Sequence, residues 1–369
     1  MKQKRLLMVF GVICLALVVA SLPFLAACAK PAPPPAPAPP PKPAPPPAPP
    51  LPKVINVGTH APGAFFNVIG TAVGTVVGKH TAMETKVNPL GGPGAWMPMM
   101  VTKEIDVGVC NIWDAWKGYL GEEAYEKLSD GKGFPIRLIL TGICNDISIG
   151  AAGDTGIKTL KDLRGKKVAA GYAKVPSCQY QVKAALANAG LTIDDVKVVP
   201  VAAPPPGVKA VLEGKADAAG TVTTGMPAWA EVVAKRGGGI LLSYDPSPEA
   251  AAKSYEYWPC GWLNLIKGGI YPGVDVDTWL MRYEVYTLCR EDLPDNAVYE
   301  IIKAMWDYNS ELPPIHPKFK EWTPEAFASK KLYCPYHPGS IKFLKEKGLW
   351  TSELEKAQKE LLAEKAAKK

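Results

Sequence analysis

The sequence predicts an α/β fold made of two lobes that face each other, and repeated local patterns support this prediction. Val54–Val57 is a short β-branched run of the kind that forms a buried strand, and glycine and proline residues end it. Apolar residues at helical spacing follow, namely Ile69, Val73, Val76 and Val77. The same order of strand, loop and helix returns between Lys167 and Gly190. Two units of one plan therefore indicate two similar lobes.

A second repeated pattern in the sequence also supports two similar lobes. Lys103–Val109 has the pattern of a helix end that leads into a buried strand, and Glu213–Gly220 repeats it. Apolar runs predict further strands at 83–87, 134–140, 147–152, 196–201, 240–244 and 285–289. Helical spacing predicts helices at 94–101, 181–189 and 295–309, helices that contain Trp116 and Trp229, and a charged, solvated tail helix at 358–369. Residues 257–266 are expected to link the second lobe back to the first.

The N-terminus has the features of a bacterial lipoprotein signal. An apolar stretch at 6–19 follows a charged start, and Leu25-Ala26-Ala27-Cys28 resembles the lipobox. We therefore expect residues 1–27 to be the signal peptide and Cys28 to carry the lipid that anchors the protein to a membrane. A plain secretory signal or an N-terminal membrane helix is the alternative, although the apolar stretch is short for a stable span.

Residues 28–52 are expected to be the lipidated cysteine and a stalk, because almost every residue from Pro31 to Pro52 is proline or alanine. Such a segment has no core-forming side chains and favours polyproline II, which extends by roughly 3.1 Å per residue. At full extension the stalk would hold the folded body on the order of 60 to 70 Å from the bilayer.

Charge and motif content exclude several functions. The formal net charge is +7, and removing Lys2, Lys4 and Arg5 from the 42 basic residues leaves 39 against 35 acidic ones, or +4. This charge is too mild to predict nucleic-acid binding, and no basic stripe with aromatic residues occurs. The sequence has no Cys-x-x-Cys, no phosphate loop and no nucleophile elbow, so no metal, no cofactor and no enzyme activity are expected.

The cysteines of the folded body are widely spaced and would lie in an oxidising compartment. One to three disulfides are expected among them, in a pairing that the spacing leaves open. They are Cys110, Cys144, Cys178, Cys260, Cys289 and Cys334.

Loops at the carboxyl ends of the predicted strands contain the first ligand-binding candidates, because ligands of open α/β sheets bind outside these ends. An ordinary turn is the alternative for the first of these loops, Thr59 to Phe66, and His60 either donates to a carboxylate or caps a turn. The candidates are Thr59, His60, Gly63, Ala64, Phe65 and Phe66 after the first strand, Asn111, Trp113 and Asp114 in the next loop, and Thr223, Thr224 and Gly225 in the equivalent loop of the second lobe.

A set of ordered motifs resembles one transport family. The motifs are VGT at 57–59 with Gly63, Phe65 and Phe66, IDVG at 105–108, IKTLKDLRGKKV at 157–168, GKADA at 214–218 with GMP at 225–227, YPG at 271–273, and YHPGS at 336–340 with KEKG at 345–348. Together they resemble the TAXI family, the solute-binding subunits of tripartite ATP-independent periplasmic (TRAP) transporters, over about residues 54–350.

The resemblance implies a type II periplasmic binding protein fold, in which crossing hinge strands join two α/β lobes. Lobe 1 would comprise residues 53–145 and 258–369, and lobe 2 residues 146–257. The resemblance also implies that Lys174, Ser177 and Cys178 contact the ligand and that the ligand is a small carboxylate.

This sequence departs from the family in ways that predict a more apolar ligand pocket with fewer hydrogen-bond donors. The family usually has Gly-Ser-Gly-Thr where this chain has Val175-Pro176-Ser177-Cys178, and Phe65-Phe66 replaces a tyrosine pair. Proline removes a backbone donor and valine narrows the approach to the loop. We therefore expect a carboxylate with an apolar or aromatic body.

The expected function is an extracytoplasmic solute-binding lipoprotein in the periplasm. It would capture a small organic acid and deliver it to the membrane permease subunits of a TRAP transporter. Two alternatives stay open. The same body could present its closed form to a signalling receptor, or a periplasmic enzyme could use Cys178 or Cys110 with a histidine, which requires a thiol of low pKa.

Overall fold

The structure is a computed structural model that describes residues 49–329 and 331–368. The chain from residue 49 onward belongs to one compact unit. The predicted signal peptide, the lipidated Cys28 and the stalk as far as residue 48 lie outside the described residues. Within the described residues, no helix is both long and apolar enough to cross a membrane.

The described part of the chain contains a mixed sheet of 11 strands. The strands are β1 (Val54–Thr59), β2 (Glu84–Pro89), β3 (Val107–Asn111), β4 (Ile136–Leu140), β5 (Cys144–Ala152), β6 (Lys167–Ala170), β7 (Lys197–Pro200), β8 (Ala218–Thr223), β9 (Gly239–Leu241), β10 (Trp262–Ile266) and β11 (Thr278–Arg290).

Helices connect and flank these strands. The α-helices are α2 (Phe65–His80), α3 (Pro93–Val101), α4 (Ile112–Leu120), α5 (Ser177–Asn188), α6 (Pro204–Leu212), α7 (Pro227–Lys235), α8 (Pro248–Tyr257), α9 (Asp295–Asp307), α10 (Pro338–Glu346) and α11 (Ser352–Ala367). The 3₁₀ helices are η1 (Glu123–Tyr125), η2 (Gly153–Thr155), η3 (Leu160–Leu163), η4 (Ile193–Asp195), η5 (Asn309–Glu311), η6 (Pro317–Glu321) and η7 (Pro324–Phe327).

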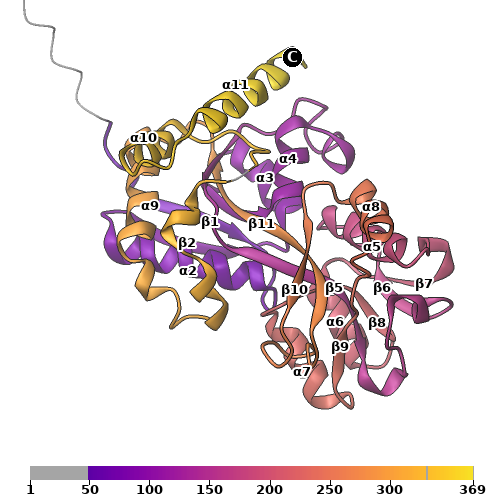
Figure 1. The fold of residues 1–369 in the computed structure, drawn as a ribbon. Coiled ribbons are helices and arrows are strands. Elements are labelled where there is room, and N and C mark those ends of the chain that lie inside the picture. Colours follow the sequence, from indigo (N-terminus) through magenta and orange to yellow (C-terminus); the bar gives the residue numbers. More distant parts are fainter. Residues whose placement is uncertain (1–48, 330, 369) are drawn as a thin grey trace, which may run out of the picture. The chain divides into compact units, whose positions relative to one another are not determined.

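Two strands, β5 and β11, run between the halves of the sheet. The strand order is β2-β1-β3-β11-β5-β8-β6-β7, with β4 and β10 paired to β11 and β9 paired to β5. The end of β11 is antiparallel to β3, whereas its middle is antiparallel to β5. Figure 1 shows β5 and β11 between the half that contains α2, α3 and α9 and the half that contains α5 to α8. The predicted α/β fold with two lobes and crossing strands is confirmed, and the residue limits of the lobes stay a prediction.

Burial explains why the opening segment folds as the sequence predicts. In β1, Ile55 and Val57 are buried, and the apolar stripe predicted for α2 is buried as well. Trp96 of α3 covers Gly58 of β1 and Gly108 of β3, where an added Cβ would lie 2.9 and 2.5 Å from the indole. These two glycines therefore let α3 pack directly on the sheet.

Some predicted boundaries are wrong. The segment Asn111–Asp114 is not a loop, because Asn111 ends β3 and caps α4 by accepting from the backbone N–H of Asp114 at 2.8 Å. Ser177 and Cys178 form the first turn of α5 instead of the loop before it. The linking segment 257–266 contains β10, and the predicted strand 285–289 is only the end of the 13-residue β11.

The predictions for the tail helix and the disulfides are also wrong. Helix α11 begins at Ser352 and buries one face, and Gln358 on that face bonds the backbone of Tyr336. All six cysteines of the described residues are free, and five of them are buried. A buried thiol packs as a small apolar side chain, so the core accommodates these cysteines without pairing them.

Candidate functional site

A hollow lies between the two halves at the carboxyl ends of β1, β3 and β8. Its empty volume is about 350 Å³, of which about 20 Å³ is open to the centre of a water molecule. In this conformation it is nearly closed and has room for about one water. We call it the central pocket. It is lined by His60, Ala64, Phe65, Phe66, Asn111, Val175, Cys178, Gln181, Pro204, Thr221, Thr223, Met226 and Tyr283.

The first half contributes the loop after β1 and the first turn of α2. His60 is buried, and its ring stacks on Phe66 with 4.5 Å between centroids and an interplanar angle of 17°. Helix α2 begins after Ala64 with no side-chain cap. The free N–H groups of such a helix start are donors for an oxygen atom of a ligand.

The second half contributes α5, the start of α6 and the end of β8. Gln181 lies one turn after Cys178 on α5, and Thr221 and Thr223 are two residues apart, so they share one face of β8. Tyr283 of β11 closes the pocket from the crossing strand, and its hydroxyl accepts from the Asn145 amide at 3.4 Å.

The central pocket contains buried polar atoms without partners. Among the described residues, no group has hydrogen-bond geometry to His60 Nε2, Gln181 Oε1 or Thr221 Oγ1. The Tyr172 hydroxyl and the Cys178 thiol lie near the Thr221 hydroxyl without reaching that geometry. The side chains of His60, Gln181 and Thr221 are each only 3% exposed. A buried polar atom that lacks a partner costs about 1–3 kcal/mol. Ten such side-chain atoms occur among the described residues, and three of them gather at this one pocket, which indicates groups held ready for a ligand.

The lining carries no positive charge. None of the described residues that line the central pocket is lysine or arginine. Burial lowers the pKa of His60 to about 3, so its imidazole is neutral at physiological pH. Burial likewise raises the pKa of the Cys178 thiol. The pocket is therefore neutral, polar at three points and otherwise apolar.

Behind the pocket wall, a hydrogen-bond network joins the two halves. Asp114 on α4 accepts from the amide of Asn111 at 2.6 Å, from the hydroxyl of Tyr125 at 2.8 Å and from the hydroxyl of Ser177 at 2.6 Å. Burial raises the pKa of Asp114 to about 6, although the hydrogen bonds from Ser177, Tyr125 and Asn111 oppose this shift. Because Ser177 starts α5 of the second half, the network holds the halves together.

Aromatic contacts reinforce the same closure. The ring centroid of Trp113 on α4 lies 4.5 Å from that of Tyr180 on α5 and 6.2 Å from that of Trp258. Trp113 is buried in this stack and does not line the central pocket. Its role in the structure is to pack one half on the other.

The structure brings several predicted site residues together and separates the others. Those that line the central pocket are His60, Ala64, Phe65, Phe66, Asn111, Cys178 and Thr223. Thr59, Trp113, Asp114 and Ser177 lie behind the wall, where they bond or pack against protein groups. Gly63, Lys174, Thr224 and Gly225 do not line the central pocket. Gly63 and Lys174 lie where the halves approach each other, with Ala228 3.5 Å from a Cβ at Gly63 and the Lys174 side chain 3.3 Å from a Cβ at Gly91. Thr224 is buried and its backbone N–H donates to the Asp146 carbonyl at 2.9 Å, and Gly225 lines a neighbouring hollow.

Sequence reasoning missed Gln181, Thr221 and Tyr283. Two of them had a local signal: Thr221 shares a strand face with the candidate Thr223, and Gln181 lies one helical turn beyond the candidate Cys178. Tyr283 had no such signal, because it reaches the site only through the length of β11.

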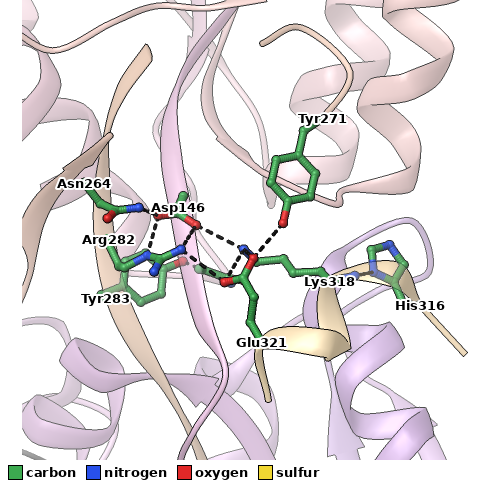
Figure 2. Close-up of polar contacts among 9 residues, drawn as sticks. Asp146, Asn264, Tyr271, Arg282, Tyr283, His316, Lys318 and Glu321 are labelled. Atoms are coloured by element: carbon green, nitrogen blue, oxygen red, sulfur yellow. Dashed lines mark hydrogen bonds and ion pairs between the residues drawn. The ribbon is translucent and has the colours of Figure 1, made fainter. Parts of the chain in front are cut away.

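A separate group of charged residues lies on the crossing strands β5 and β11 and on η6 (Figure 2). We call it the hinge cluster, and it consists of Asp146, Arg282, Lys318 and Glu321. Arg282 of β11 donates to Asp146 of β5 at 2.6 and 2.9 Å, and the buried Lys318 donates to Asp146 at 3.0 Å. Glu321 accepts from Arg282 at 3.1 Å and from Tyr271 at 2.8 Å. Burial alone would raise the pKa of Asp146, but the Arg282 hydrogen bond and the Lys318 charge hold it below its usual value.

Comparison with known proteins gives one family and several solved structures. The NMT1-like family matches residues 57–348. A structure described as a periplasmic transporter is similar at 13% identity with a TM-score of 0.49, over 83% of this chain and 95% of that one. The methylphosphonate complex of PhnD1 from Prochlorococcus marinus (MIT 9301) is similar at 13% identity and a TM-score of 0.49, over 81% and 99%. The alkanesulfonate-binding protein SsuA from Xanthomonas axonopodis pv. citri is similar at 11% identity with a TM-score of 0.44, over 84% of this chain and 95% of that one.

Proposed function

This chain belongs to the NMT1-like family, and from that premise we propose that it is an extracytoplasmic solute-binding protein. It captures a small organic acid, or an uncharged analogue of such an acid, with an apolar or aromatic body in the central pocket and releases the solute chemically unchanged. Phe65, Phe66 and Met226 supply the apolar surface for that body.

One observation carries the proposal: three buried polar atoms face the central pocket without partners, and they come from both halves. His60 belongs to the first half, whereas Gln181 and Thr221 belong to the second. A solute that bonds all three is held by both halves at once. The present conformation has room for about one water, so the halves stand further apart around a bound solute than they do here. A form that closes around the solute binds it better than an open form does, and this difference drives closure.

The contacts between Asp114 and Ser177 and between Trp113 and Tyr180 stabilise the closed arrangement. They make closure favourable without occupying the pocket. In this account the contacts between α4 and α5 stabilise the closed form, and the loop after β1 together with β8 binds the solute.

Delivery to a membrane transporter is the finer part of the proposal. The TAXI-like motifs and the lipobox at Cys28 support docking on the permease subunits of a TRAP transporter by a protein anchored to a membrane in the periplasm. The anchor would keep the protein at a high local concentration beside its transporter.

A cysteine-dependent enzyme is less well supported by the same residues. A nucleophilic cysteine needs a thiolate at neutral pH. Burial raises the pKa of Cys178 and lowers that of His60, so neither a thiolate nor an imidazolium is populated at that pH.

Calorimetry with a panel of short aliphatic and aromatic acids and their uncharged analogues tests the proposed function. We expect binding of one molecule per chain by at least one class, and recovery of the bound compound unchanged after denaturation. Conversion of a bound compound into a product, or no binding by any member of the panel, would contradict the proposal.

A further inference from the structure

The charges around the central pocket limit what kind of solute group can enter it. The described lining residues include no cationic side chain, and the one histidine among them is neutral. One charge next to the lining is that of Asp114, which bonds the lining residue Asn111. Asn111 lines the pocket, and the same Asn111 amide donates to the Asp114 carboxylate at 2.6 Å. A solute in contact with Asn111 therefore lies one side chain away from a buried carboxylate.

This carboxylate is stabilised by neutral groups. Its hydrogen bonds come from Asn111, Tyr125 and Ser177, none of which carries a positive charge. The Tyr125 hydroxyl and the Cys110 and Cys178 thiols beside Asp114 have raised pKa values because of burial, with the charge of Asp114 as the next cause. These shifts show that a second negative charge in this region is unfavourable.

The partnerless atoms of the central pocket match an uncharged group. A threonine hydroxyl, a neutral imidazole and a carboxamide each donate or accept a hydrogen bond without a charge. A planar group with both a donor and an acceptor satisfies several of them together, as a primary amide or a protonated carboxyl group does. A carboxylate accepts only, and it would enter without any cation to offset its lost hydration.

We propose that the solute presents an uncharged hydrogen-bonding group to His60, Gln181 and Thr221 and places its apolar body against Phe66 and Met226. Suitable groups are an amide, an alcohol, or the acid in its protonated form. This inference rests on the proposed function and specifies the form in which the solute is bound. The hydrogen bonds to the pocket replace those that the group makes to water, and no charge is buried.

Matched pairs of compounds test the inference. Calorimetry of the full chain at pH 7.5 would compare benzamide with benzoate and acetamide with acetate, because each pair has one body and differs in the charge of its head group. We expect the amide of the better-binding pair to bind at least tenfold more tightly than the acid. Equal binding, or tighter binding of benzoate, overturns the inference and leaves the proposed function intact, whereas no binding by any of the four contradicts both.

Two variants test the cause of the preference. Asp114→Asn removes the buried charge and keeps the shape, and we expect the preference for benzamide over benzoate to fall at least threefold. Gln181→Arg places a permanent cation in the lining, and we expect it to reverse the preference. If Asp114→Asn does not fold, the ratio of benzamide to benzoate affinity in Gln181→Arg still tests the inference. A preference that neither folded variant changes would overturn the inference.

Discussion

The hinge cluster and the central pocket both gather polar groups at the crossing region of the fold, but the groups of the hinge cluster are paired with one another, whereas several of those in the central pocket are not. In the hinge cluster, Asp146 and Glu321 are matched by Arg282 and Lys318, and each makes a hydrogen bond within the cluster (Figure 2). In the central pocket, three polar atoms have no partner among the described residues.

The difference distinguishes a cluster whose polar groups the protein itself pairs from a pocket in which three unpaired atoms gather at one place. Native proteins rarely leave a buried polar atom unpaired, because the cost of desolvation is not recovered. The paired charges of the hinge cluster hold β5, β11 and η6 together. The unpaired atoms of the central pocket make no such contribution to the empty protein, and we expect a solute to supply their partners.

The largest effect is expected from breaking the hinge cluster. Lys318→Met removes the buried cation beside Asp146 and leaves the Asp146 carboxylate short of one partner. Loss of one member of a buried ion pair destabilises a protein by about 3–5 kcal/mol. Urea unfolding followed by tryptophan fluorescence measures the loss. Lys320→Met, at an exposed position of the same 3₁₀ helix, is the control, and an equal loss in both variants would contradict the account.

The next effect concerns the contact between Asp114 of α4 and Ser177 of α5, and it depends on pH. Burial raises the pKa of Asp114 from 3.8 to about 6, so the folded protein binds this proton more tightly than the unfolded chain does. Its contribution to stability is fully present below pH 3.8 and is lost as the pH rises through 6.

Comparison of the wild type with Asp114→Asn isolates the contribution of Asp114 to the free energy of unfolding, because both proteins have all the other titrating groups. Between pH 4 and 7 the free energy of unfolding of the wild type should fall by about 2 kcal/mol relative to that of the variant. Denaturant unfolding at a series of pH values measures the difference. Parallel curves for the two proteins would show that Asp114 is not held in a desolvated site.

A smaller effect, on binding and not on stability, is expected in the central pocket. Thr221→Val removes a hydroxyl that has no partner in the empty protein. Benzamide should bind about five- to tenfold more weakly, a loss of ~1 kcal/mol, while the free energy of unfolding stays the same or rises.

Thr224→Val is the matched comparison, because Thr224 also has a buried hydroxyl without a partner but does not line the central pocket. Calorimetry and urea unfolding on both variants decide the point. A loss of binding in Thr224→Val but not in Thr221→Val would favour the loop predicted from the sequence over the pocket in the structure.

The smallest effect is expected at an exposed ion pair, which sets the scale for the hinge cluster. Lys235 and Glu231 lie 2.6 Å apart on the surface of α7, and Lys235 is largely exposed. Lys235→Ala should change the free energy of unfolding by about 0.3–0.5 kcal/mol, and 1 M salt should abolish the difference. A loss comparable to that of Lys318→Met would remove the contrast between buried and exposed charges.

Much of the fold could be predicted because its elements are encoded locally. The β-branched run of β1 and the apolar stripe of α2 appear as strand and helix at the expected places. The hinge cluster could not be predicted in this way. Asp146 and Arg282 are 136 residues apart in sequence, and they meet only because the register of β5 against β11 places them opposite each other.

The site was predicted in part for a similar reason. The rule that ligands bind at the ends of strands located His60, Phe66 and Thr223 in the lining. It could not tell which way a side chain points. Asp114 was expected to face a ligand, but its place in the first turn of α4 directs its carboxylate to Tyr125 and Ser177.

The most direct test of the account is a mass spectrum of the small molecules released when the native protein is purified and denatured, compared between the wild type and Thr221→Val. The account predicts one main solute per chain in the wild type, with an apolar body and an uncharged hydrogen-bonding group, and much less of it in the variant. A wild type that releases no solute, or equal amounts of the same molecules from both proteins, would contradict it.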